Sequence, residues 1–200
     1  IVHVIPYPIP NHLKDLKIKK ESKKKLIKLI FASRNDPVKG GDLFIQVLSN
    51  LGDKIKTKMQ VSIYGFSPKT IPNNLPLIKF FNFVSQKDLA EVYRESDICV
   101  VPSIFDNSPN TVYEAMAYGK IIIASNVGGI PEIIKKEENG FLFKKNDPID
   151  FADKIKSAVE MLLAGDGLKM RLNAKRRINK YASLSHNVNR RLKLLWIQEY

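Results

Sequence analysis

Two acidic residues, Asp106 and Glu114, stand eight positions apart in the stretch 100–124, which reads VVPSIFDNSPNTVYEAMAYGKIIIA. An apolar run ends before Pro102, a short polar loop carries Asp106, and a segment with helical spacing carries Glu114 before a second apolar run. This order predicts a strand, a loop, a helix and a strand. In a parallel sheet the loop after a strand lies at the carboxyl edge, where open α/β sheets bind ligands. Both carboxylates could therefore face one pocket.

The start of the predicted helix offers a second kind of chemistry. Ser108 and Pro109 are typical of a helix start, with a hydroxyl at the cap and proline at the first helical position. The backbone amides of Asn110, Thr111 and Val112 would then lie in the first turn, where free N–H groups and the helix dipole can bind an anion. An ordinary capped helix with water on these amides is the alternative.

Each carboxylate also has a structural alternative. Glu114 lies near the edge of an apolar helical stripe, so partial burial would oblige it to find a donor, either a ligand hydroxyl or a protein amide. Asp106 could instead stabilise its own loop as an Asx-turn residue.

A basic loop, RNDPVKGG, follows the apolar run 26–33. Arg34 and Lys39 could both reach an anion at the sheet edge, Arg34 as a fork and Lys39 as a point charge. Gly40 would let the backbone approach such a ligand closely. A solvated loop is the alternative. The sequence contains neither a P-loop nor the GxGxxG dinucleotide signature.

The supporting elements alternate between strands and helices, which predicts a Rossmann-like, doubly wound parallel sheet of the α/β class. We expect a weak strand at 1–5 and strands at 26–33, 59–64, 78–83, 98–101, 121–124 and 141–143. We expect helices after a capping Asp42, from Ser85 with Asp88 at the capping-box position and Tyr93 facing inward, at Pro131, from a capping Asp147 to 163, at 168–181 and at 187–200.

Composition limits the alternatives. The 200 residues suit one domain, and no apolar run reaches the length of a membrane span. Cys99, the single cysteine, lies in an apolar run and is expected to be a buried bystander. The three histidines show no metal-ligand spacing, so no metal site is expected. A single cysteine allows no internal disulfide, which fits a reducing compartment, and we expect a cytoplasmic location. The proline-rich start lacks a signal-peptide cleavage site and an initiator Met, so we expect it to be no signal peptide and the chain to be a piece of a longer protein.

The net charge of +13 is concentrated in two segments, residues 13–28 at +6 and residues 168–195 at +9. We expect solvated faces first and contact with an anionic membrane surface second. No recognised nucleic-acid-binding module is visible, so no nucleic acid partner is expected.

Taken together, the ordered motifs resemble the C-terminal half of a family 4 retaining glycosyltransferase of the GT-B fold. The opening VIPYPIP is similar to the interdomain connector of that family, and Asp106 replaces its usual first Glu. The matching motifs are Arg34-x4-Lys39-Gly40, Asp106-x7-Glu114 with the following Ala-Met-Ala-Tyr-Gly, Gly128-Gly129-Ile130-Pro131-Glu132, Phe83-Val84-Ser85 and Asn139-Gly140.

The resemblance implies a role for each site residue. Arg34, Lys39 and the loop glycine Gly40 would hold the diphosphate of a UDP- or GDP-linked sugar, together with amides at the helix start, from Asn110, Thr111 and Val112. Glu114 would bind the ribose, the backbone near Val84 the base, and Asp106 the transferred sugar. Arg34, Lys39, Asp106 and Glu114 would thus form the catalytic set of a hexosyl-type transferase. Transfer would retain the anomeric configuration and need neither a cofactor nor a metal.

The resemblance also implies a domain plan. Residues 1–25 would be the connector and Lys-rich loop, 26–181 the donor-binding domain, and 182–200 a helix packing toward a missing N-terminal domain. We expect a saccharide or lipid-linked acceptor in polysaccharide biosynthesis and a peripheral position at the inner face of the membrane. We also expect this chain alone to have little activity. The alternatives are a non-catalytic nucleotide- or polyanion-binding module and a GT-B relative such as a nucleotide-sugar epimerase.

Overall fold

The computed structural model describes residues 9, 13, 16–18, 23–182, 187–189 and 192. Six strands form one sheet in the order β3-β2-β1-β4-β5-β6, and all five neighbouring pairs are parallel. This confirms the Rossmann-like sheet. The strands are β1 (Ile27–Ala32), β2 (Met59–Tyr64), β3 (Leu77–Phe81), β4 (Ile98–Val101), β5 (Ile121–Ser125) and β6 (Phe141–Phe143).

The strand order reverses between β1 and β4. From β1 the chain winds outward to β3 and then crosses back to β4, next to β1. The loops that leave these two central strands therefore run in opposite directions and open a crevice at their carboxyl ends, the usual ligand position in such sheets.

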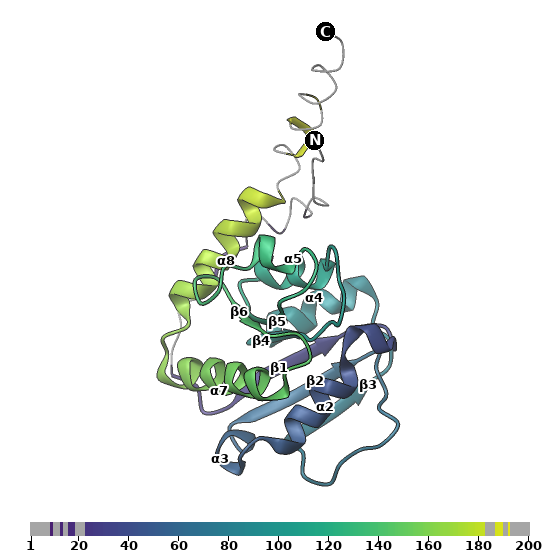
Figure 1. The fold of residues 1–200 in the computed structure, drawn as a ribbon. Helices are drawn as coiled ribbons and strands as arrows, with labels where there is room; N and C mark the ends of the chain where they lie inside the picture. Colours follow the sequence, from purple (N-terminus) through teal and green to yellow (C-terminus); the bar gives the residue numbers. More distant parts are fainter. Residues whose placement is uncertain are drawn as a thin grey trace.

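Helices cover both faces of the sheet (Figure 1). On one face lie α2 (Gly41–Asn50), α3 (Asp53–Lys56) and α7 (Pro148–Ala164). On the other lie α4 (Gln86–Glu95), α5 (Asn110–Ala117), α6 (Ile130–Ile133) and α8 (Leu168–Tyr181). Successive side chains of β1 alternate between the two cores, with Leu29 and Phe31 toward α2 and α7 and Ile30 toward α5 and α8. Burial on both faces accounts for the nearly continuous apolar runs in the sequence.

Two expected helix starts are confirmed at the level of their caps. The Ser85 side chain accepts the Asp88 amide at 3.2 Å, and the Asp147 carboxylate accepts the amides of Ile149 and Asp150 at 3.1 and 2.9 Å. Each of these caps satisfies amides that the first turn leaves without a helical partner.

Two other expected caps are wrong. Asp42 lies inside α2, because the 3-10 helix η1 (Pro37–Lys39) leads directly into α2 through Gly40 at a φ of +73°. Ser108 does not cap α5, which begins after Pro109 without a side-chain cap. The Ser108 hydroxyl lies instead 3.2 Å from the Tyr113 hydroxyl.

The strand expected at 78–83 is β3 at Leu77–Phe81, and α3 was not expected.

The expected strand at 1–5 lies outside the described residues, as do most of the connector and of the helix expected at 187–200. Of the described positions there, Ile9 and Leu13 are buried against the core that contains α8, and the Ile9 amide donates to the Ala182 carbonyl at 2.9 Å. Residues 187–189 are helical. In the part of the chain that the structure describes, no helix is long and apolar enough to cross a bilayer.

Candidate functional site

The loops after β1 and β4 pack tightly against each other at the point where the strand order reverses. The Ile104 amide donates to the Val38 carbonyl at 2.8 Å, which joins the two loops by a backbone hydrogen bond. A Cβ atom on Gly40 would lie 1.9 Å from the Pro102 carbonyl oxygen, so only glycine allows this approach. The close packing of the two loops is therefore sufficient to explain a glycine at position 40. The Gly40 amide donates to the Pro37 carbonyl at 3.1 Å, so it is already occupied within its own loop.

Between these loops lies a cavity of about 260 Å³, which we call the central cavity. Five residues expected from the sequence to bind a ligand line it together: Arg34, Lys39, Asp106, Asn110 and Thr111. The remaining lining comes from Phe31, Ala32, Ser33, Val100, Val101, Ser103, Ser108 and Pro109. The structure thus brings together polar groups from two loops that are almost seventy residues apart in the chain.

An ion pair crosses the central cavity. The Lys39 ammonium lies 2.7 Å from Asp106 Oδ2, and both side chains are partly buried. The Ser108 amide donates to Asp106 Oδ1 at 3.3 Å, so Asp106 also forms the Asx-turn that the sequence left open. The Asx-turn occupies Asp106 Oδ1, while Oδ2 faces Lys39 in the central cavity, so the structural role does not withdraw the carboxylate from this cavity.

Three further groups at this cavity have no acceptor among the described residues. The Arg34 guanidinium is exposed, and neither it nor the backbone amides of Asn110 and Thr111 donates to another described residue. The Val112 amide differs from our expectation, since it donates to the Pro109 carbonyl at 3.0 Å and is not open to a ligand. A guanidinium and two amides at a helix start form an arrangement suited to a phosphate.

Glu114 lies one turn beyond Thr111 on α5 and lines neither of the cavities described here. It is partly buried, and burial raises the pKa of its carboxyl group above the ordinary Glu value, while a 3.0 Å hydrogen bond from the Tyr93 hydroxyl opposes this rise.

Cys99 is completely buried, and burial raises the pKa of its thiol. Both observations agree with the expected role of Cys99 as a residue of the core that takes no part in the chemistry.

The raised pKa of Glu114 predicts that Glu114→Gln stabilises the protein at neutral pH. A carboxyl group that binds its proton more tightly in the folded state favours folding when protonated, and this contribution is lost as the pH rises through the folded-state pKa. Thermal unfolding at pH 7 should therefore show a higher Tm for Glu114→Gln than for the wild type. The difference should shrink near pH 4, where Glu114 is also largely neutral; a constant difference would contradict this assignment.

A second cavity of about 250 Å³, which we call the lateral cavity, adjoins the first. It shares Ala32, Ser33, Arg34 and Thr111 with the central cavity, and Tyr64, Phe83, Val84 and Leu89 complete it. Val84 was expected at the site. Phe83 was not, although an apolar side chain that is 78% exposed beside a cavity is well placed to contact a planar ligand.

The Gly128-Gly129 turn supports the loop that carries Asp106. The Gly129 amide donates to the Asp106 carbonyl at 3.1 Å. A Cβ on Gly128 would lie 2.1 Å from that carbonyl oxygen, and one on Gly129 would lie 2.1 Å from the Asn107 carbonyl oxygen. The two glycines therefore allow the backbone contact that positions the acidic loop.

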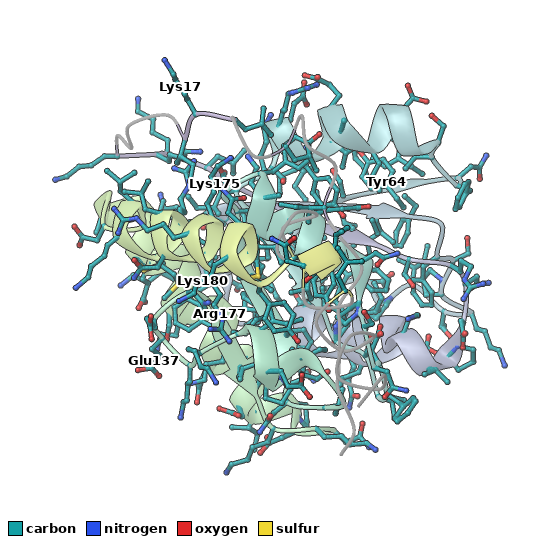
Figure 2. All side chains as sticks on the ribbon, turned by 90° about the horizontal axis from the view of Figure 1, so that it is seen from above. Lys17, Tyr64, Glu137, Lys175, Arg177 and Lys180 are labelled. Atoms are coloured by element: carbon teal, nitrogen blue, oxygen red, sulfur yellow. The ribbon has the colours of Figure 1, made fainter. Side chains whose placement is uncertain are left out.

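The basic residues of α8 are not simply a solvated face. Figure 2 shows the molecule from above, with Lys175, Arg177 and Lys180 of this helix labelled. Arg171 donates to the Gly119 carbonyl at 2.8 Å, and Lys175 donates to the Ala117 carbonyl at 3.1 Å, both at the C-terminal end of α5. Cations at this position satisfy free carbonyls and the negative end of the helix dipole. Part of the positive charge is therefore structural.

The model of the family described as glycosyl transferases group 1 matches residues 14–181. The chain therefore belongs to this glycosyltransferase family. A D-inositol 3-phosphate glycosyltransferase of Geodermatophilus obscurus is 29% identical over 156 residues, which cover 68% of this chain and 35% of that protein. An uncharacterized glycosyltransferase of Methanocaldococcus jannaschii is 32% identical over 130 residues, covering 63% of this chain and 36% of that protein.

Solved structures of other proteins share the fold. A Rickettsia africae glycosyltransferase superimposes with a TM-score of 0.70 at 25% identity, covering 86% of this chain and 47% of that one. Anabaena HepE in complex with UDP-glucose gives a TM-score of 0.70 at 18% identity, covering 85% and 48%. The chain thus has the architecture of one half of a GT-B enzyme, and it spans about a third of the length of the curated glycosyltransferases that it matches.

Proposed function

We propose that this glycosyltransferase chain binds the nucleoside diphosphate sugar, and that residues 26–181 form its donor-binding domain. The observation that carries the proposal is the central cavity, where Arg34, Lys39 and the free amides of Asn110 and Thr111 converge. The complex of the structural neighbour HepE with UDP-glucose supports a donor of this chemical class.

The diphosphate would lie in the central cavity. As the bond between the anomeric carbon and the phosphate oxygen breaks, negative charge develops on the leaving nucleoside diphosphate. Arg34, Lys39 and the amides at the start of α5 would stabilise this charge in a preorganised setting. Lys39 would have to exchange its present partner Asp106 for a phosphate, which would free Asp106 to accept hydrogen bonds from hydroxyls of the transferred sugar.

The nucleoside would extend into the lateral cavity. Val84 and Phe83 line that cavity and could contact the base, by backbone hydrogen bonds and by ring stacking respectively. Thr111 lines both cavities, and Glu114 follows it by one helical turn, so the ribose hydroxyls between diphosphate and base would lie within reach of the Glu114 carboxylate.

The finer assignments follow the family resemblance. We propose a hexosyl-type transfer with retention of the anomeric configuration, to a saccharide or lipid-linked acceptor in polysaccharide biosynthesis, at the inner face of the membrane. The partner domain would supply the acceptor side, so the 200-residue chain should bind donor and transfer little. Product analysis on the full-length protein, with the anomeric configuration read by NMR, would distinguish transfer from the epimerase alternative.

Calorimetric titration of the chain with UDP, GDP and ADP tests the proposal. We expect saturable binding of one nucleotide in the presence of EDTA, since the cationic groups of the site do the electrophilic work, and a loss of about tenfold or more in Glu114→Ala. A polyanion-binding module would instead lose about a thousandfold between 50 and 200 mM salt without nucleotide preference. Absence of binding, or equal binding by Glu114→Ala, would contradict the donor site.

A further inference from the structure

Tyr93 meets Glu114 across the interface between α4 and α5. Its hydroxyl donates to Glu114 Oε2 at 3.0 Å although the two residues are 21 positions apart. The Tyr93 side chain is only 1% exposed, and its ring stacks on Tyr118 with centroids 5.3 Å apart and an interplanar angle of 20°. The phenol is therefore held rigidly, and it points its one donor at the carboxylate.

No other described residue supplies Glu114 with a donor. The carboxylate takes part in no ion pair within the described ranges, and the Tyr93 hydroxyl is the one group there that donates to it. Its second oxygen, Oε1, has no donor among them. An ionised carboxylate can accept hydrogen bonds on both oxygens, so Oε1 keeps the capacity to accept a further one.

We propose that Tyr93 is a positioning residue for donor binding, which holds one oxygen of Glu114 so that the other is presented to the ligand. This inference rests on the proposed function, because it assumes that Glu114 accepts hydrogen bonds from ribose hydroxyls. Tyr93 itself lines neither cavity and touches no ligand in this scheme. It acts through Glu114.

The surroundings of Glu114 determine what removal of the hydroxyl would do. The titratable groups that face it are Tyr93 on α4, Cys99 on β4 and Tyr118, just after α5. Burial raises the pKa of all three, so they are neutral in the physiological range. The Tyr93 hydrogen bond is thus the interaction that lowers the pKa of Glu114, and its loss would raise that pKa further.

The test compares Tyr93→Phe with Glu114→Ala and with Tyr181→Phe. Tyr93→Phe keeps the stacked ring and removes only the hydroxyl. Tyr181→Phe is the matched control, since it removes another tyrosine–carboxylate hydrogen bond, to Glu132 Oε2 at 3.1 Å, away from both cavities. The measurements are calorimetric affinity for the nucleotide that the wild type binds best, recorded against pH, and NMR titration of the Glu114 carboxyl carbon.

We expect Tyr93→Phe to weaken nucleotide binding about tenfold at pH 7. Its affinity should begin to fall at a higher pH on the acid side than in the wild type, and the Glu114 carboxyl should titrate at a higher pH. Combined with Glu114→Ala, the Tyr93 change should have little further effect, because that variant removes the acceptor through which the hydroxyl acts. Tyr181→Phe should bind like the wild type.

The outcomes separate the two claims. Unchanged binding in Glu114→Ala would contradict the proposed function, whatever Tyr93 does. Weak binding in Glu114→Ala with wild-type affinity and pH dependence in Tyr93→Phe would overturn the positioning role alone. If Tyr93→Phe lowers only the Tm and leaves the titration of Glu114 unchanged in the NMR experiment, Tyr93 is merely structural, and this arm decides even if no nucleotide binds.

Discussion

The double variant Arg34→Ala, Lys39→Ala should lose affinity for the nucleoside diphosphate by at least about a hundredfold. Charge-assisted hydrogen bonds contribute about 1.5–3 kcal/mol each, and this variant removes both side-chain cations that line the central cavity. The loss should be seen by calorimetry as a higher Kd at constant stoichiometry. The free nucleoside, which lacks the diphosphate, should bind about equally weakly to both proteins.

The matched control removes the same charge elsewhere. Lys54 and Lys58 are exposed and precede β2, so they lie at the amino edge of the sheet, opposite the cavities. Lys54→Ala, Lys58→Ala should bind nucleotide within about twofold of the wild type, because screened charges at that distance contribute little. Equal losses in the two double variants would indicate that net charge, and not this site, attracts the ligand.

Gly40→Ala should destabilise the fold strongly. The residue has a φ of +73°, and a Cβ would lie 1.9 Å from the Pro102 carbonyl oxygen, a backbone atom that cannot move alone. The left-handed conformation costs an L-residue about 1–2 kcal/mol and overpacking about 1–3 kcal/mol, so we expect a loss of about 2–5 kcal/mol. For a chain of this length, Tm should fall by about 5–20 °C.

Gly52→Ala is the control for this substitution. Gly52 has an ordinary φ of −67°, and a Cβ there would meet nothing within 4 Å. Its free energy of unfolding should stay within about 1 kcal/mol of the wild type. If Gly40→Ala unfolds at the same temperature as Gly52→Ala, the two loops do not pack as described. Nucleotide binding should also fall in Gly40→Ala, since Lys39 and Asp106 lie on those loops.

The sequence was sufficient for features that depend on local spacing. The Ser85–Asp88 and Asp147 caps involve residues two or three positions apart, so the pattern itself contains the partners. The parallel sheet was predicted from the alternation of strand-like and helix-like segments along the chain. The expected roles of Asp42 and Ser108 failed because competing local geometry was stronger: the 3-10 turn through Gly40 starts α2 early, and Tyr113 engages the Ser108 hydroxyl.

Contacts across the fold could not be predicted in the same way. The pair Lys39–Asp106 joins loops 67 positions apart, and only the crossing from β3 to β4 makes them neighbours. Tyr93 was expected to face inward as an apolar residue, and nothing in its local pattern indicates that its hydroxyl meets Glu114. Likewise, the basic residues of α8 looked like a solvated face because their carbonyl acceptors lie in the last turn of α5 and just after it, more than fifty positions earlier.

The most direct measurement is a crystal structure of the chain soaked with whichever of UDP, GDP or ADP binds best. We expect the diphosphate in the central cavity, with phosphate oxygens about 2.7–3.2 Å from Arg34, Lys39 and the amides of Asn110 and Thr111, and the base beside Val84. Diphosphate density on the exposed cations of α8, Lys169, Arg176 and Lys180, would contradict it and favour a polyanion-binding module.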